Sequence, residues 1–166
     1  RDAAAERLGQ RHARIIAMLG RTAMRVLDNL QEKAAEIRAA VETEETDAVS
    51  KLPQYRLLNW IRTGVLLNDE GEDMGETGLE PGESRKLNRG EVMQILAELK
   101  IPGLIDEAAI ERKLGHMLSE RGQSPTLVAP MVGWSTATDM IRDMVDVNPM
   151  DEVVQKRTDG RMLAEY

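Results

Sequence analysis

An eleven-residue repeat of apolar side chains runs along the N-terminal part of the chain. Leucine or valine recurs at every eleventh position, and a second row of isoleucine and valine keeps the same spacing. At about 3.67 residues per turn, such rows form a nearly straight apolar stripe on one face of a helix. The stripe, which we expect to bind another protein, consists of Leu8, Ile15, Leu19, Val26, Leu30, Ile37 and Val41.

Composition favours helices for the rest of the chain as well. Aromatic residues make up only 2% of the 166 residues, with no Phe, whereas Met occurs ten times. A core built from aliphatic side chains and adaptable Met favours helix–helix packing over a β-sandwich. No stretch alternates apolar and polar residues as a strand would. We therefore predict an all-α fold, with a long N-terminal helix followed by a compact bundle of short helices.

Breaks in the helical pattern divide the chain into four parts. Residues 1–47 are predicted to form a long helical arm, ended by a run of Glu and Thr. Residues 48–67 hold a short helix and a connection, residues 68–87 form an acidic, Gly-rich linker, and residues 88–166 form a small helical domain. The short helix is expected at 54–63. The helices expected in the last part cover residues 89–99, 106–120, 136–146 and 149–164.

Capping residues support several of these helix boundaries. Asn88 and Glu91 have the spacing of a capping box at the start of the 89–99 helix. Ser135 is expected to cap the 136–146 helix, and Gly64 to end the short helix at 54–63. Trp134 stands at the Gly-Trp-Ser turn between two of the helices, where we expect it to fill the core.

The residues needed for catalysis or metal binding are scarce. The chain contains no Cys and only two His, His12 on the apolar stripe and His116 far from it in sequence. Neither a Gly-x-Ser-x-Gly elbow nor a paired-His zinc motif is present. We therefore expect no catalytic residue, no cofactor and no metal, and predict that the chain is not an enzyme.

Two acidic features were weighed against that prediction. The carboxylates from Asp69 to Glu76 could gather around a cation, but their spacing fails the twelve-residue calcium loop, so we interpret them as solvated. Glu83-Ser84 resembles the Glu-Ser pair of lytic transglycosylases, in which Glu is the general acid/base. A carboxyl group exposed in a Gly-rich loop lacks the desolvation that raises a catalytic pKa, so a solvated Glu83 is favoured.

Charge argues against a strong general attraction to phosphate or anionic lipid, because the net charge is −7. The one locally basic surface lies on the first helix and comprises Arg7, Arg11, Arg14, Arg21 and Arg25. Residues 1–42 contain eight bases and six acids, so a solvated face is favoured over a DNA contact. No apolar stretch approaches the roughly 20 residues of a membrane helix.

The C-terminal quarter, residues 127–166, resembles a helical segment of large phage proteins: internal virion, DNA-ejection and polyvalent proteins. The matching pattern is an apolar helix that ends in the Gly133-Trp134-Ser135 turn, then a helix opening at Thr138-Asp139, then a helix carrying Thr158-Asp159 and Arg161-Met162. Trp134 replaces the Phe of that pattern, and Met131-Val132 replaces a bulkier apolar pair.

The resemblance implies a structural segment that packs in the capsid core or portal region and assists genome delivery. Its implied partners are other copies of itself and other virion proteins of the portal or core. Its implied location is the virion interior, and the host cytoplasm during assembly. The residues alone leave an alternative open, a self-associating helical adaptor or scaffold protein of a cell or plasmid, without catalysis. An enzyme that uses Glu83 or the acidic loop is the third hypothesis.

Overall fold

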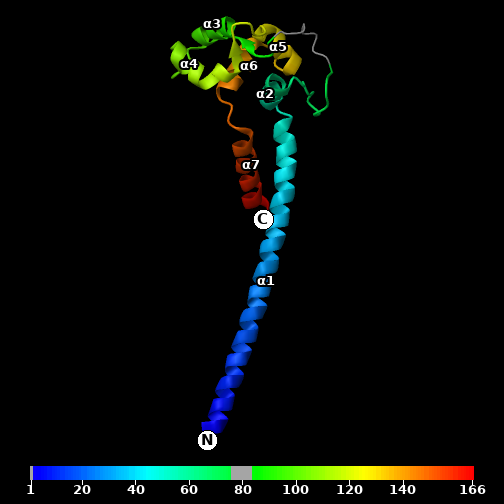
Figure 1. Ribbon diagram of the computed structural model, residues 1–166, viewed down its shortest axis with the longest axis vertical. Helices are drawn as coiled ribbons and strands as arrows, with labels where there is room; N and C mark the ends of the chain where they lie inside the picture. Colours follow the sequence, from blue (N-terminus) through cyan, green and yellow to red (C-terminus); the bar gives the residue numbers. More distant parts are fainter. Residues whose placement is uncertain (1, 76–83) are drawn as a thin grey trace. The chain divides into compact units, whose positions relative to one another are not determined.

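The computed structural model describes residues 2–75 and 84–166, which are mainly helical (Figure 1). The predicted all-α class, with a long N-terminal helix and shorter helices after it, is confirmed. The helices are α1 (Asp2–Ser50), α2 (Pro53–Thr63), α3 (Arg89–Leu99), α4 (Glu107–Leu114), a 3-10 turn η1 (Gly115–Met117), α5 (Pro125–Val132), α6 (Ala137–Val145) and α7 (Met150–Glu165). Two short strands are β1 (Leu87–Asn88) and β2 (Leu118–Ser119).

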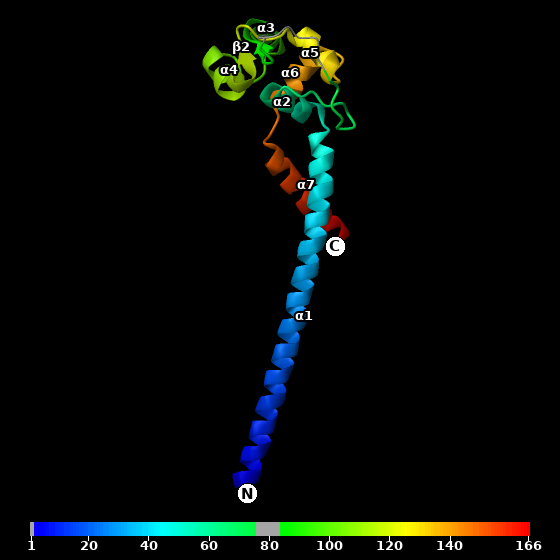
Figure 2. The same cartoon turned by 45° about the vertical axis from the view of Figure 1, so that its right-hand side comes forward.

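The chain divides into two compact units. The first comprises the residues up to 43 together with residues 158–166, and the second comprises residues 44–157. In the first unit the last turns of α7 lie beside α1 in both ribbon views (Figures 1 and 2). An ion pair fixes this contact, with 2.5 Å between Arg38 Nη2 and Asp159 Oδ1.

Helix α1 continues past the point at which we expected it to end. The Glu- and Thr-rich run at 42–47 does not stop the helix, which extends to Ser50. Glu is a good helix former, which allows the helix to continue through this run. The break comes only before Pro53, the first residue of α2. At about 1.5 Å per residue, the 49 residues of α1 span roughly 73 Å.

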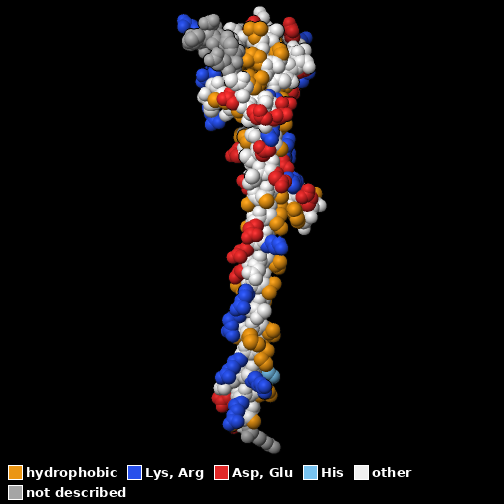
Figure 3. All heavy atoms as spheres, turned by 90° about the vertical axis from the view of Figure 1, so that its right-hand side faces the viewer, with side chains coloured by type: hydrophobic (Ala, Val, Ile, Leu, Met, Phe, Trp, Pro, Cys, Tyr) orange, Lys and Arg blue, Asp and Glu red, His pale blue; other side chains and the backbone are white. Residues whose placement is uncertain are grey.

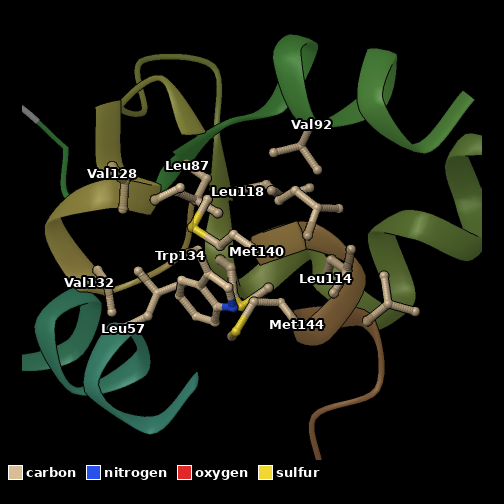
Figure 4. Close-up of a cluster of buried hydrophobic side chains, with 14 of the residues drawn as sticks. Leu57, Leu87, Val92, Leu114, Leu118, Val128, Val132, Trp134, Met140 and Met144 are labelled. Carbon is tan, nitrogen blue, oxygen red and sulfur yellow. The ribbon is translucent and has the colours of Figure 1, made fainter. Parts of the chain in front are cut away.

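The core of the second unit gathers apolar side chains from α2, α3, α4, α5, α6 and both strands. Figure 4 shows the Trp134 indole among Leu57, Met140 and Met144. Trp134 is buried, and its indole N–H donates to Asp143 Oδ2 at 2.7 Å. The prediction that Trp134 fills the core at the turn is thereby confirmed.

The helix starts agree with the sequence in part. Asn88 caps α3, because its side-chain oxygen accepts a hydrogen bond from the Glu91 N–H at 3.0 Å. In a capping box the Glu91 side chain would also accept a hydrogen bond from the Asn88 N–H. Here the Asn88 N–H donates instead to the Gln123 carbonyl at 2.8 Å. The expected Ser135 cap is wrong by one residue: Thr136 caps α6 and accepts from the Asp139 N–H at 3.1 Å.

The two strands contradict the expectation of a chain without strands and of a continuous 106–120 helix. β1 and β2 pair in parallel, with Leu87 opposite Leu118. Helix α4 therefore ends at Leu114, and β1 takes the last residue of the predicted 68–87 linker. Both paired leucines are buried in the core. Two-residue strands carry no readable alternation, so only the packing of distant segments reveals them.

Candidate protein-interaction surface

The apolar stripe lies on one continuous helix, α1, in which every described residue up to position 36 is exposed. Five of the predicted stripe residues keep between 45% and 61% of their surface exposed. A chain in water gains free energy by removing such side chains from the solvent. These five form the open part of the stripe: Leu8, Ile15, Leu19, Val26 and Leu30.

The last two predicted stripe residues are not part of the open surface. Ile37 is half-buried, and Val41 is only 4% exposed. They lie on either side of Arg38, which binds Asp159 in the part of the first unit where the end of α7 lies beside α1. The expectation that Val41 is available to a partner is therefore corrected: the stripe ends near Leu30.

Other large apolar side chains widen this surface. Ile16 and Leu27 flank the stripe, and Met18 and Met24 add exposed apolar area elsewhere around the helix. These two methionines fall outside the eleven-residue rows, so the repeat did not predict them as part of the interaction surface. Figure 3 shows apolar side chains along one side of α1. The nine large apolar residues of α1 that are exposed all lie between Leu8 and Leu30.

The exposed apolar area is large enough to drive association. Burying an aliphatic side chain completely is worth about 1.5–3 kcal/mol, so a half-exposed one has about 1 kcal/mol to gain. Met18 and Met24 lie away from the stripe, so the seven side chains on and beside it would contribute roughly 7 kcal/mol per copy. Two copies together would gain about 14 kcal/mol, which exceeds most of the range of about 4–15 kcal/mol for the cost of association.

Basic side chains lie mostly on a different side of the same part of α1 from the stripe, as Figure 3 shows. At about 100° per residue they fall away from the stripe. All are exposed, and among the residues that the structure describes none of them forms an ion pair with a carboxylate. These residues, here called the arginine row, are Arg7, Arg11, Arg14, Arg21 and Arg25.

The second unit contains an apolar pocket of about 720 Å³, a size that suits small ligands. Its wall includes Leu58 of α2 and Met144 of α6. The Tyr55 hydroxyl, also in the wall, donates to the Asn148 carbonyl at 2.7 Å. Burial raises the pKa of the Tyr55 phenol, and the nearby Arg157 charge opposes this shift. The described lining residues include His116, Lys86 and Lys113 but no carboxylate or thiol.

Arg56 is a buried cation with a structural role. Its Nε donates to the Lys51 carbonyl at 2.9 Å, and its Nη1 donates to the Leu67 carbonyl at 3.2 Å. Burial lowers the pKa of Arg56, an effect that the nearby Asp69 carboxylate opposes. These bonds join α2 to the chain segments on both sides of it. The guanidinium is therefore already occupied by the protein's own backbone.

The described acidic residues form an ordered turn. Asn68 Oδ1 accepts hydrogen bonds from the N–H groups of Glu70 and Glu72, each at 2.9 Å. Within residues 2–75 and 84–166 no group of three or more potential metal ligands is present. Glu76, at the end of the possible cation site, and Glu83, of the Glu-Ser pair, lie outside the described residues. None of the described helices is both long and apolar enough to span a bilayer.

No family model, curated protein or solved structure matches this chain. Its strongest described feature is an all-α fold whose longest helix exposes an apolar stripe from Leu8 to Leu30.

Proposed function

We propose that the chain is a non-catalytic assembly segment that self-associates through the open stripe of α1. The observation that carries this proposal is the concentration of exposed large apolar side chains between Leu8 and Leu30, seven of which lie on or beside the stripe. A second copy offers the same straight stripe over the same length, so each copy can cover the other in a symmetric contact. Monomeric soluble proteins rarely leave an apolar surface of this extent in water.

The setting that we propose is the interior of a phage particle. There the segment would belong to an internal virion protein, pack in the capsid core near the portal and assist genome delivery. The support is the resemblance of residues 127–166, centred on the Gly-Trp-Ser turn at Trp134. The partners would be other copies, together with portal or core proteins. A cellular or plasmid-borne adaptor or scaffold is the alternative.

The test of self-association combines two charges placed in the stripe, Leu19→Asp and Val26→Asp. Light scattering over a range of concentrations should show an oligomer for the wild-type chain and a monomer for the double variant. Circular dichroism should show that the second unit stays helical, because its core contains neither residue. The matched control, Gln10→Asp with Asn29→Asp, adds the same charge to α1 away from the stripe and should remain oligomeric.

Two results would contradict the proposal. One is a wild-type chain that stays monomeric at every concentration. The other is dissociation by the Gln10 and Asn29 control as well, which would assign the effect to charge on the helix and not to the apolar seam.

A further inference from the structure

The charges of α1 are segregated along its length. Residues 7–27 contain five bases and no acid, a local charge of +5. Residues 28–47 contain seven acids and two bases, a local charge of −5. The basic segment therefore stands out in a chain whose net charge is −7. It covers most of the interval, Leu8 to Leu30, in which α1 exposes its large apolar side chains.

The arginine row does not stabilise the isolated helix. Arg7 and Arg11, like Arg21 and Arg25, are four residues apart, and Arg11 and Arg14 are three apart. Like charges at these spacings are neighbours on a helix surface and destabilise it. Among the described residues no carboxylate neutralises them. An external anionic surface would therefore relieve a repulsion that the chain itself leaves in place.

The partner must match two properties of the same helical segment, an apolar face and a basic face. A second copy covers the apolar face but brings its own arginine row. A nucleic-acid duplex supplies phosphates but offers no apolar layer for Leu19 and Val26. An anionic lipid surface supplies both, because acyl chains accept the apolar face and anionic headgroups attract the arginines.

We propose that residues 7–30 of α1 bind the surface of an anionic membrane. The helix lies in the plane of the interface, with the open stripe inserted toward the acyl chains and the arginine row among and above the headgroups. This mode requires no membrane-spanning segment. It goes beyond self-association and competes with it, since both use the same stripe. The chain would therefore bind the membrane as a monomer, not as the oligomer.

The experiment measures partitioning of the whole chain onto phosphatidylglycerol vesicles by sedimentation, at concentrations at which light scattering reports a monomer. Wild type should bind these vesicles, gain no comparable affinity for phosphatidylcholine vesicles, and be released by salt. Replacing Arg21 and Arg25 by Gln should weaken binding about 25-fold, because each arginine near an anionic surface contributes about fivefold. The matched control, Arg112→Gln with Arg121→Gln, makes the same change in net charge and should bind as wild type.

Light scattering on the same variants separates this proposal from self-association. The Arg21 and Arg25 variant should still form the oligomer, whereas Leu19→Asp with Val26→Asp should lose both oligomer and vesicle binding. Three results would overturn the membrane proposal: no binding of wild type to anionic vesicles, equal binding to neutral vesicles, or arginine-dependent binding to a DNA duplex without binding to vesicles. The last result would show that the arginine row binds nucleic acid instead of lipid.

Discussion

Gly122 marks the closest approach of two backbone segments in the second unit. A Cβ atom at this position would lie 2.4 Å from the Leu87 carbonyl carbon, 2.5 Å from its oxygen and 2.6 Å from the Lys86 oxygen. All three are backbone atoms, so no side chain can rotate away. Next to this contact, the Gln123 N–H donates to the Lys86 carbonyl at 2.7 Å. The Gly122→Ala variant must therefore push β1 away from the segment that follows β2.

The expected loss of stability follows from two contributions. Overpacking by a methyl group typically costs about 1–3 kcal/mol, and here no flexible atom relieves it. Moving the segments apart also weakens the hydrogen bonds that Gln123 makes with Lys86 and Asn88, each worth about 1 kcal/mol. We predict that Gly122→Ala lowers the free energy of unfolding by about 3–5 kcal/mol. This is a large part of the 5–15 kcal/mol that holds a typical domain together.

Tryptophan fluorescence during urea unfolding reports the stability of the second unit, which contains Gly122. The chain has two Trp, Trp60 and Trp134, and both lie in the second unit. The matched control is Gly90→Ala in α3, where the added Cβ would make only an ordinary 3.5 Å contact with the Asn88 side chain. It should be neutral or stabilising by up to about 1 kcal/mol. A Gly122→Ala chain as stable as Gly90→Ala would refute the close packing of β1 described above.

Three further predictions concern the cap, the buried phenol and the acidic turn. Asn88→Ala should lower the free energy of unfolding by about 1 kcal/mol in the same assay, because α3 loses its N-cap. Burial raises the Tyr55 pKa from 10.0, so the folded state holds that proton more tightly and stability should fall as pH rises above 10.0. Tyr55→Phe should flatten this dependence in urea titrations across that range. Calcium should leave the melting temperature unchanged, since a ligand bound only by the native state would raise it.

Periodic features were predictable from the sequence because they repeat. The stripe from Leu8 to Leu30 follows from the eleven-residue spacing, and an apolar residue every third or fourth position outlines α3 around Val92 and Leu96. The Asn88 cap is also local, since acceptor and donor lie three residues apart. Such signals require no knowledge of where the rest of the chain lies.

Features that depend on distant contacts were missed for a physical reason. Val41 fits the stripe by spacing, but it is only 4% exposed in the folded chain. Leu118 continues the apolar pattern of α4, yet it pairs with Leu87 in a parallel strand. Gly122 lies just beyond the predicted 106–120 helix, and its missing side chain makes room for the Leu87 backbone. Each outcome depends on a partner that no local window contains.

The basic segment is not apparent when the charges are counted over the whole N-terminal part of the chain. Counted over residues 1–42, eight bases and six acids nearly cancel. Counted over residues 8–30, in which the large apolar side chains are exposed, four arginines stand against a single acid, Asp28. The basic segment appears only when the charges are counted over this shorter interval.

Hydrogen exchange at two protein concentrations tests the central claim, that the open stripe of α1 is the self-association surface. At low concentration the amides of residues 8–30 should exchange rapidly, because this part of α1 is exposed on all sides. At high concentration the same amides should become protected, while those around Val92 and Met140 in the core of the second unit stay unchanged. Protection of residues 8–30 that does not depend on concentration, or new protection confined to the second unit, would contradict the account.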